Sequence, residues 1–444
     1  MTGLTAYKLW RKYFRYKYLL GVFEEKLKNR TSIGLDWISS ENFENTIDEN
    51  INVIIRKCNA LTYEFTRYRE ILISKGANKL PRQISIPTIR DKLVLVVINK
   101  ILTGVFEASA VTPMPQVIID EIKQTMQNDM YDTFIKIDIS SFYASIDHEI
   151  LISKIKKRIK KKEVLHLLNC AIKTETVQPG GLVTDKEKTT GVPEGLSISN
   201  ALANIYLHDV DKIYSENHDR YKYWRYVDDI LVLTSKMEAD SLKCSLVKEF
   251  GELGLKYNEG KSCSGEIKDG FEYLGYFLSR SLISVRKSSV VSLERALDFI
   301  FRSYDKSESK NVDYLKWKID LKVTGFIIDN HKYGWLFFYS QINDLRAIAH
   351  LDWLVAKLSK RYNINVDIQF KKFIRSYNEI SHALHTTSYI PNLDIITIEE
   401  KRNIVHNIYG EDIRNRNDDF VNGRFRRLMN REIRDIQKDV QTLS

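Results

Sequence analysis

The sequence predicts an α+β fold. Between residues 134 and 280, short strand-like segments (FIKIDIS, ILVLTS and FEYLGYFLS) alternate with segments of helical period (HEILISKIKKRIKKKEVLHLL, SISNALANIYLHDVDKIY and MEADSLKCSLVKEFGELG). In the first 80 residues, and from about residue 290 to the end, nearly every segment has helical period. We therefore expect one core that combines helices with a sheet, and helical extensions on both sides of it.

The order of elements follows from three further stretches. NTIDENINVIIRKCNALTYEF has apolar residues at helical spacing. LPRQISIPTIRDK then changes to a short alternating strand pattern that ends at Pro87. The strongest helical segment of the second half is YGWLFFYSQINDLRAIAHLDWLVAKLSKRY. No repeat or long Pro/Gly/Ser linker separates these parts, so we expect them to pack closely.

The composition bounds the kind of protein. With 444 residues, 43% of them hydrophobic, the chain can form roughly two to four modules around a large core. The formal charge of +10, with 24 Tyr and 19 Phe, suits a polyanionic partner with stackable bases, although a moderately basic enzyme needs no nucleic acid. Four scattered cysteines form no CxxC, and the N-terminus does not resemble a signal peptide. We expect a soluble, cytoplasmic protein without a membrane segment.

Three aspartates stand where strand-like segments end. Asp138 ends a buried strand in FIKIDIS, and YVDD places Asp228 and Asp229 where two strand-like runs meet. Neighbouring carboxylates disfavour ionisation unless a cation neutralises them, and three can hold two Mg²⁺ ions about 4 Å apart. Because adjacent strand residues point to opposite faces, we expect Asp228 to be the main ligand and Asp229 an outer one. A solvated hairpin turn is the alternative for this pair.

Six motifs follow one another along the chain: LPRQISIPTIRDKLVL (80–95), DISSFYASI (138–146), GVPEGLSISN (191–200), YVDD (226–229), GLKYNEGKS (254–262) and FEYLGYFL (271–278). Each is weak alone, but in this order they resemble the motifs of bacterial reverse transcriptases of the group II intron and retron-like superfamily. The helical segment that begins with YGWLFFY looks like the thumb of these enzymes. The chain is most similar to the defence-associated (abortive-infection and unknown-group) members.

The resemblance implies a right-hand polymerase with fingers, palm and thumb. It divides the chain into an N-terminal helical extension (1–75), fingers (76–133), a palm with an antiparallel sheet (134–280), a helical thumb (281–365) and a C-terminal helical region (366–444). Asp138, Asp228 and Asp229 would be the catalytic residues that hold two Mg²⁺ ions. FEYLGYFL would form the hairpin that grips the primer strand.

The resemblance also assigns roles within two palm motifs. Tyr143 would lie under the sugar of the incoming nucleotide and exclude a 2′-hydroxyl, whereas a core aromatic is its alternative role. Gly191, Pro193 and Gly195 would form a turn that lets the backbone approach the template base or the nascent pair. Glu194 lies in the same turn and would contact the template or the nucleotide. Many reverse transcriptases have Gln at this position, so the chain departs from the family pattern there.

Four cations complete the expected site. Arg82 and Arg90 would meet the triphosphate of the nucleotide, with Lys92 beside them, because phosphoryl transfer needs neutralisation of developing charge. Surface salt bridging is the alternative for each. Lys261 in NEGKS would be the general acid that protonates pyrophosphate.

The expected function is RNA-templated DNA synthesis from deoxynucleotides. The defence-associated resemblance implies a dedicated noncoding RNA as template or partner, and a role against phage infection. The alternatives are a catalytically silent RNA-binding scaffold, a retron-type enzyme and an RNA-dependent RNA polymerase. Three convergent acids argue against the scaffold because they would repel phosphate, and Tyr143 argues against ribonucleotide use. The sequence does not indicate the template, the priming mechanism or the oligomeric state.

Overall fold

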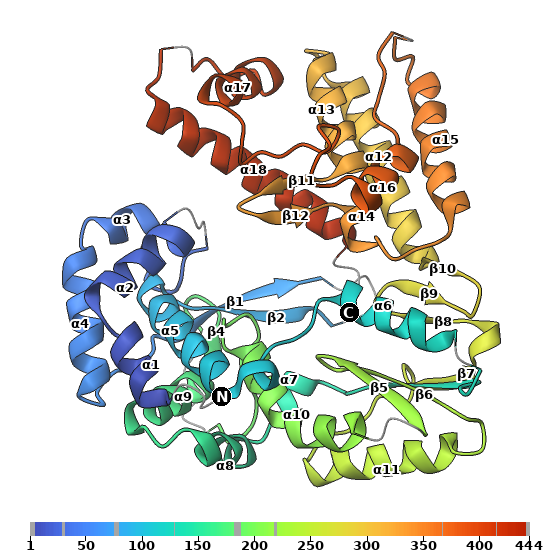
Figure 1. Ribbon diagram of the computed structural model, residues 1–444. Helices are drawn as coiled ribbons and strands as arrows, with labels where there is room; N and C mark the ends of the chain where they lie inside the picture. The colour runs from blue at the N-terminus through green and yellow to red at the C-terminus, as the bar shows by residue number, and fades with distance from the viewer. Residues whose placement is uncertain are drawn as a thin grey trace. The chain divides into compact units, whose positions relative to one another are not determined.

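The computed structural model describes residues 5–28, 32–74, 80–127, 129–181, 188–216, 220–365, 367–413 and 415–440. They form two compact units (Figure 1). Unit 1 consists of Met1–Pro113 and Thr133–Ser264, and unit 2 consists of Met114–Asp132 and Gly265–Ser444. The five-part division at the residue boundaries given above stays a prediction.

Unit 1 begins with short helices, as the sequence predicts: α1 (Ala6–Tyr13), α2 (Tyr16–Val22), η1 (Phe23–Leu27), α3 (Ser40–Glu44) and α4 (Ile47–Asn59). Thr5 and Ser39 cap α1 and α3, because their side chains accept bonds from backbone N–H groups of the first turn. Buried residues of α1, α2 and α4 pack against α5 (Ile89–Phe106), which η2 (Glu107–Ala110) follows.

The central helix of unit 1 is α5. Its length and composition, within the stretch Ile89–Met126, would also suit a membrane span. Leu93, Val97 and Ile101 are fully buried, however, and α5 contacts α1, α2, α4 and α9 (Lys162–Lys173). A helix that is apolar nearly all round is expected at the centre of a large core.

Unit 1 contains two sheets. In one, β1 (Tyr68–Ile73) pairs antiparallel with β2 (Arg82–Ile86) and parallel with β4 (Thr176–Val177). The other has the strand order β5-β6-β3-β7, built from β3 (Thr133–Asp138), β5 (Tyr221–Tyr226), β6 (Asp229–Thr234) and β7 (Cys263–Glu266), of which unit 1 includes Cys263 and Ser264. Both β3 and β5 run antiparallel to β6. The strands predicted from FIKIDIS and ILVLTS are therefore confirmed, as is the α+β class.

The remaining helices of unit 1 are α7 (Phe142–Ser145), α8 (His148–Arg158), α9, α10 (Ser199–Ser215) and α11 (Ala239–Glu252). The sequence predicted one continuous helix where the structure has α8 and α9. The helix breaks because Ile159 has an extended backbone (φ −111°, ψ 114°) and a fully buried side chain. The two helices are thus separated at Ile159, a buried residue whose neighbours in the sequence are lysines and arginines.

Unit 2 begins with α6 (Pro115–Met126) and continues after β7 with η3 (Ile267–Asp269). A three-stranded antiparallel sheet follows, formed by β8 (Phe271–Tyr273), β9 (Tyr276–Leu278) and β10 (Ile283–Val285). Leu274 and Gly275, between β8 and β9, both have positive φ, which is typical of a tight hairpin turn. The FEYLGYFL hairpin is therefore present, while its contact with a primer stays a prediction.

The rest of unit 2 is largely helical, with α12 (Lys287–Lys306), α13 (Val312–Thr324), β11 (Phe326–Ile328), β12 (His331–Tyr333), α14 (Trp335–Phe338), α15 (Leu345–Arg361), α16 (Phe373–His382), α17 (Ile398–Asn403), η4 (Ile404–Ile408) and α18 (Asp418–Val440). The long helical segment predicted from YGWLFFY is interrupted between α14 and α15. Asp344 begins the second helix because its side chain accepts a bond from the backbone N–H of Ala347.

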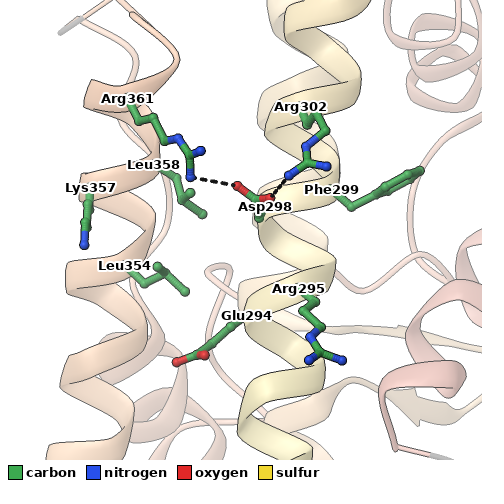
Figure 2. A pocket seen from close by; sticks show the side chains of 9 residues that line it. All are labelled: Glu294, Arg295, Asp298, Phe299, Arg302, Leu354, Lys357, Leu358 and Arg361. Atoms are coloured by element: carbon green, nitrogen blue, oxygen red, sulfur yellow. Dashed lines mark hydrogen bonds and ion pairs between the residues drawn. The ribbon is translucent and has the colours of Figure 1, made fainter.

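A groove of about 430 Å³ lies between α12 and α15 (Figure 2). Figure 2 shows Asp298 between Arg302 and Arg361, whose nitrogens lie 3.0 and 3.7 Å from its carboxylate oxygens. Arg295 and Lys357 also line the groove. Its positive charge is therefore only partly available to a ligand, since two acids, Glu294 and Asp298, line the groove with the four cations.

Two buried ion pairs attach α18 to α13. Lys318 lies 2.6 Å from the Glu432 carboxylate, and Lys322 pairs with Asp439. Tyr409 also donates to Glu432 over 2.9 Å. Buried charges are stable only when they are paired and hydrogen-bonded, so α18 is fixed to unit 2 at defined positions.

Candidate active site

The register of β3 and β6 brings two of the predicted acids together. Asp138, the last residue of β3, lies directly opposite Asp229, the first residue of β6. Directly opposed residues on paired strands project to the same face of the sheet, so both carboxylates leave that face side by side. Which of Asp228 and Asp229 is the main metal ligand stays a prediction.

The third acid, Asp228, lies in the two-residue connection between β5 and β6. Its neighbour Val227 has φ of +58°, a strained conformation for a β-branched residue that costs about 1–3 kcal/mol. The backbone N–H of Ile139 donates to the carbonyl of Asp228 over 3.2 Å, which attaches this turn to the end of β3. The surrounding structure thus fixes Asp228 next to Asp138.

Burial and mutual repulsion govern the charges of the site. Burial raises the pKa of Asp228, and it raises the pKa of Asp229 to about 6. Lys136 partly offsets the shift at Asp229, whereas the other two acids add to it. Lys261 Nζ lies 3.3 Å from Asp138 Oδ2, with 52% of the lysine side chain exposed against 10% for the aspartate. The three acids therefore form one electrostatic cluster, whose charge Lys136 and Lys261 offset only in part.

The donor set fits a hard divalent cation. Carboxylate oxygens are the ligands that Mg²⁺ takes in proteins, and the raised pKa values of Asp228 and Asp229 are consistent with a site that favours an added positive charge. In the described part of the chain, no three His, Cys, Asp or Glu side chains are already arranged as metal ligands. Lys261 instead supplies the positive charge beside Asp138.

The GLKYNEGKS loop is held against Asp138 by hydrogen bonds, most of them between backbone groups. Asn258 N–H donates to the carbonyl of Asp138 over 2.7 Å, and the backbone N–H of Asp138 donates to Ser262 Oγ over 3.2 Å. Ser140 N–H donates to the carbonyl of Lys256 over 2.8 Å. The sequence analysis placed Lys261 at the site, and these bonds are the physical reason that its side chain reaches Asp138.

Tyr143 lies on the short helix α7, close to the acids. It is 8% exposed, and its hydroxyl donates to Asn200 Oδ1 over 2.5 Å. Burial raises the pKa of Tyr143, with further contributions from the charges of Asp228 and Glu194. The side chain is thus both packed and adjacent to the site, and its role as a sugar gate stays a prediction. Asn200, which orients it, was missed by the sequence analysis.

The turn GVPEG requires glycine at both ends. Gly191 and Gly195 have φ of +94° and +98°, and a Cβ on Gly195 would lie 2.7 Å from Ile84 Cγ2. The turn is attached to β2, because Ser85 N–H donates to the carbonyl of Glu194 over 2.7 Å. It is also attached to α7, since Val192 N–H donates to the carbonyl of Tyr143 over 2.8 Å. Pro193 accepts from the Ser199 hydroxyl over 2.7 Å.

The predicted cations fall into two groups. Arg82 forms an ion pair with Glu194, so the structure joins two site candidates from distant motifs. Arg90 donates from two nitrogens to Asn50 Oδ1 on α4, over 3.0 and 2.7 Å. Lys92 donates to the carbonyl of Ser32 over 2.6 Å. Arg90 and Lys92 thus bind the N-terminal helical region here, and their contact with a triphosphate stays a prediction.

A buried histidine, His148, donates a hydrogen bond to the GVPEG turn. The sequence analysis did not predict this role. His148 Nε2 lies 2.8 Å from the carbonyl of Gly191, so this nitrogen carries the proton and donates. Its Nδ1 is buried and has no hydrogen-bond partner among the described residues, and burial lowers the pKa of the ring. The neutral form is therefore favoured. The sequence contains one pattern that could have indicated this histidine, an Asp-His pair at the start of a helix. Asp147 is explained by its capping of α8, but that cap does not explain His148.

The raised pKa of Asp229 predicts how its removal affects metal-free protein. The folded state holds this proton more tightly than the unfolded chain, so ionisation of Asp229 destabilises the fold as pH rises from about 4 through 6. We expect Asp229→Asn to raise the free energy of unfolding in EDTA at pH 8 by up to about 3 kcal/mol, and to change it much less at pH 4. Urea unfolding at both pH values measures this effect.

The control is Asp240→Asn, on the exposed side of α11, which should stay within about 0.5 kcal/mol at both pH values. Added Mg²⁺ should stabilise the wild type more than Asp229→Asn. An equal change in the free energy of unfolding at pH 4 and pH 8 for Asp229→Asn would contradict this prediction, because it would show that ionisation of Asp229 does not destabilise the fold.

Comparisons with known proteins give one family match and several similar proteins. Residues 73–278 match the family model of reverse transcriptase (RNA-dependent DNA polymerase). Protein YkfC of Escherichia coli (strain K12) is 25% identical over 307 residues, which cover 59% of this chain and 77% of YkfC. The group II intron-encoded protein LtrA of Lactococcus lactis subsp. cremoris is 29% identical over 209 residues, which cover 44% of this chain and 34% of LtrA. The chain thus matches only about a third of LtrA.

Solved structures of telomerases are also similar. Telomerase from Candida albicans in complex with a telomeric RNA fragment has a TM-score of 0.48 at 12% identity, covering 92% of this chain and 70% of that one. Apo telomerase from Candida tropicalis has a TM-score of 0.40 at 12% identity, covering 56% and 61%. Residues 73–278 thus match a reverse transcriptase (RNA-dependent DNA polymerase) domain, in the part of the chain that contains the predicted acids.

Proposed function

We propose that the protein synthesises DNA on an RNA template at Asp138, Asp228 and Asp229, by phosphoryl transfer with two divalent cations. One observation carries this proposal. Antiparallel pairing sets Asp138 opposite Asp229, the connecting turn holds Asp228 beside them, and Lys261 lies 3.3 Å from the same cluster. Such a cluster of acids has no structural advantage, because like charges in a buried site destabilise the fold.

Each residue of the site has a part in the proposal. Cations bound to the carboxylates would polarise the reacting phosphoryl group and lower the pKa of the attacking 3′-hydroxyl. Lys261 is free to leave Asp138, because half of its side chain is exposed, and to donate a proton to pyrophosphate. Arg82 would exchange Glu194 for the triphosphate of the nucleotide. The Gly191–Gly195 turn, fixed by His148, would place backbone against the nascent pair.

The main test is primer extension. Purified protein with Mg²⁺, a DNA primer on an RNA template and deoxynucleotides should produce DNA. Asp228→Asn should lower kcat by about a thousandfold or more, because several kcal/mol of transition-state stabilisation is lost. Asp240→Asn should leave kcat unchanged. If Asp228→Asn extends the primer as fast as the wild type, the site has been assigned incorrectly.

Tyr143 gives a second prediction, on nucleotide choice. Tyr143→Ala should raise the use of ribonucleotides relative to deoxynucleotides by about tenfold or more, because the ring no longer fills the space of a 2′-hydroxyl. Tyr143→Phe is the matched control, since it keeps the ring and loses only the bond to Asn200. Ratios of kcat/KM for the two nucleotide classes measure the effect. A wild type that already accepts both equally would contradict the gate.

The proposal extends to the biological role. The order of the motifs and the residues within them resemble those of defence-associated reverse transcriptases. On that resemblance we propose a dedicated noncoding RNA as template or partner, a cytoplasmic location and a role in blocking phage infection. Cells that express the wild type should show a reduced efficiency of plating for at least one phage, and cells with Asp228→Asn should not. Equal plating across a broad phage panel would remove the defence role without affecting the polymerase proposal.

A further inference from the structure

A dense run of cations joins α8 to α9. Seven of the ten residues from 154 to 163 are Lys or Arg, and one, Glu163, is acidic. The last turn of α8 contains Lys156, Lys157 and Arg158, where positive charge is favoured by the helix dipole. Ile159 is buried beneath them and holds the connection in place. The run is therefore an ordered surface and not a loose tail.

A second basic segment lies against this run. Residues 5–17, which include α1, contain five cations and no acid. Lys161 connects the two segments, because its Nζ lies 5.2 Å from the centre of the Tyr7 ring and 5.1 Å from that of Trp10. We call the combined surface the basic platform and define it by Lys8, Arg11, Lys12, Lys156, Arg158, Lys160 and Lys162. Figure 1 shows α1, α8 and α9 on one side of unit 1, and β5 and β6 on the other.

The net charge of the chain is concentrated here. Residues 5–17 contribute +5 and residues 154–163 contribute +7 − 1 = +6, so these two segments exceed the formal net charge of +10, and the rest of the chain is close to neutral. A general excess of surface lysine would be spread evenly. Charge repulsion within one surface destabilises a fold, which favours a counter-charge from a partner.

Little of this charge is neutralised within the protein. Asp209 already pairs with Lys154, and Glu163 already pairs with Lys161. Among the residues that the structure describes, no acidic side chain pairs with Lys156, Lys160 or Lys162. Arg158 lies over the Phe106 ring, 5.3 Å from its centre. Its guanidinium edge therefore remains free for hydrogen bonds.

The chemistry of the platform distinguishes between polyanions. A membrane-binding surface needs exposed apolar anchors, but Leu9, Trp10 and Phe106 are all buried. Single-stranded nucleic acid is usually held by several exposed aromatic rings, and the large exposed ring here is Tyr7, at 58%. Closely spaced cations with few stacking groups suit the regularly spaced phosphates of a duplex.

We propose that the basic platform binds the phosphate backbone of a double-helical part of the RNA on which the protein acts, away from the catalytic acids. This inference rests on the proposed function and extends it. The template segment enters the site of Asp138, Asp228 and Asp229, while a folded segment of the same RNA is held on α1, α8 and α9. Recognition is by shape and charge, with little dependence on sequence.

The test measures binding of the full chain to a blunt RNA hairpin of about 16 base pairs that offers no primer end. Fluorescence anisotropy at several salt concentrations gives Kd and its salt dependence. Lys160→Gln/Lys162→Gln should raise Kd about tenfold and reduce the slope of log K against log salt by about 2, one for each lost phosphate contact. The matched control is Lys243→Gln/Lys248→Gln on α11, which should behave like the wild type.

Three further results decide the inference. Primer extension on a short RNA template should be unchanged in both double variants, because neither touches the catalytic acids. The same preparations thus separate failure of the platform from failure of the polymerase. Equal Kd and slope for the wild type and Lys160→Gln/Lys162→Gln would overturn the inference, as would binding to phosphatidylserine vesicles or to an acidic peptide in preference to the hairpin.

Discussion

The antiparallel register of β3 and β6 is the constraint on which the site depends. It sets Asp138 opposite Asp229 at the end of the sheet, and the two-residue connection from β5 then leaves Asp228 beside them. Like charges in a half-buried position destabilise the fold, and the raised pKa of Asp229 reflects that cost. A shift of the register by one residue would turn one carboxylate to the other face of the sheet and would disperse the cluster.

The surrounding elements hold this unfavourable arrangement in place. The turn that contains Asp228, the glycine turn at 191–195 and the loop around Asn258 are each attached by backbone hydrogen bonds to the end of β3 or to the segment that follows it. His148 fixes the same turn from the interior. Because backbone groups make several of these bonds, the positions of the catalytic side chains depend strongly on the fold. Lys261 and Arg82, by contrast, form ion pairs with Asp138 and Glu194 through their side chains.

The sequence predicted the parts of this account that local patterns determine. Period-two apolar runs gave β3 and β6, and the order of six motifs indicated the reverse transcriptase domain. It could not predict that Asp138 faces Asp229, because strand register depends on contacts between distant segments. It also missed Asn200 and His148, whose roles arise only when separate motifs meet. The break at Ile159 was missed for a related reason, since its burial outweighs helical periodicity. That break creates the ordered basic connection to which we assign RNA binding.

The central claim is that three acids, gathered by strand register, form the cation site of a polymerase. Binding of Mn²⁺, followed by electron paramagnetic resonance, tests this directly on protein held with a terminated DNA primer, an RNA template and a deoxynucleotide. The account predicts two tightly bound Mn²⁺ ions per wild-type chain and fewer in Asp138→Asn, with the fold unchanged by circular dichroism. The same number of tightly bound ions in the wild type and in Asp138→Asn would contradict it.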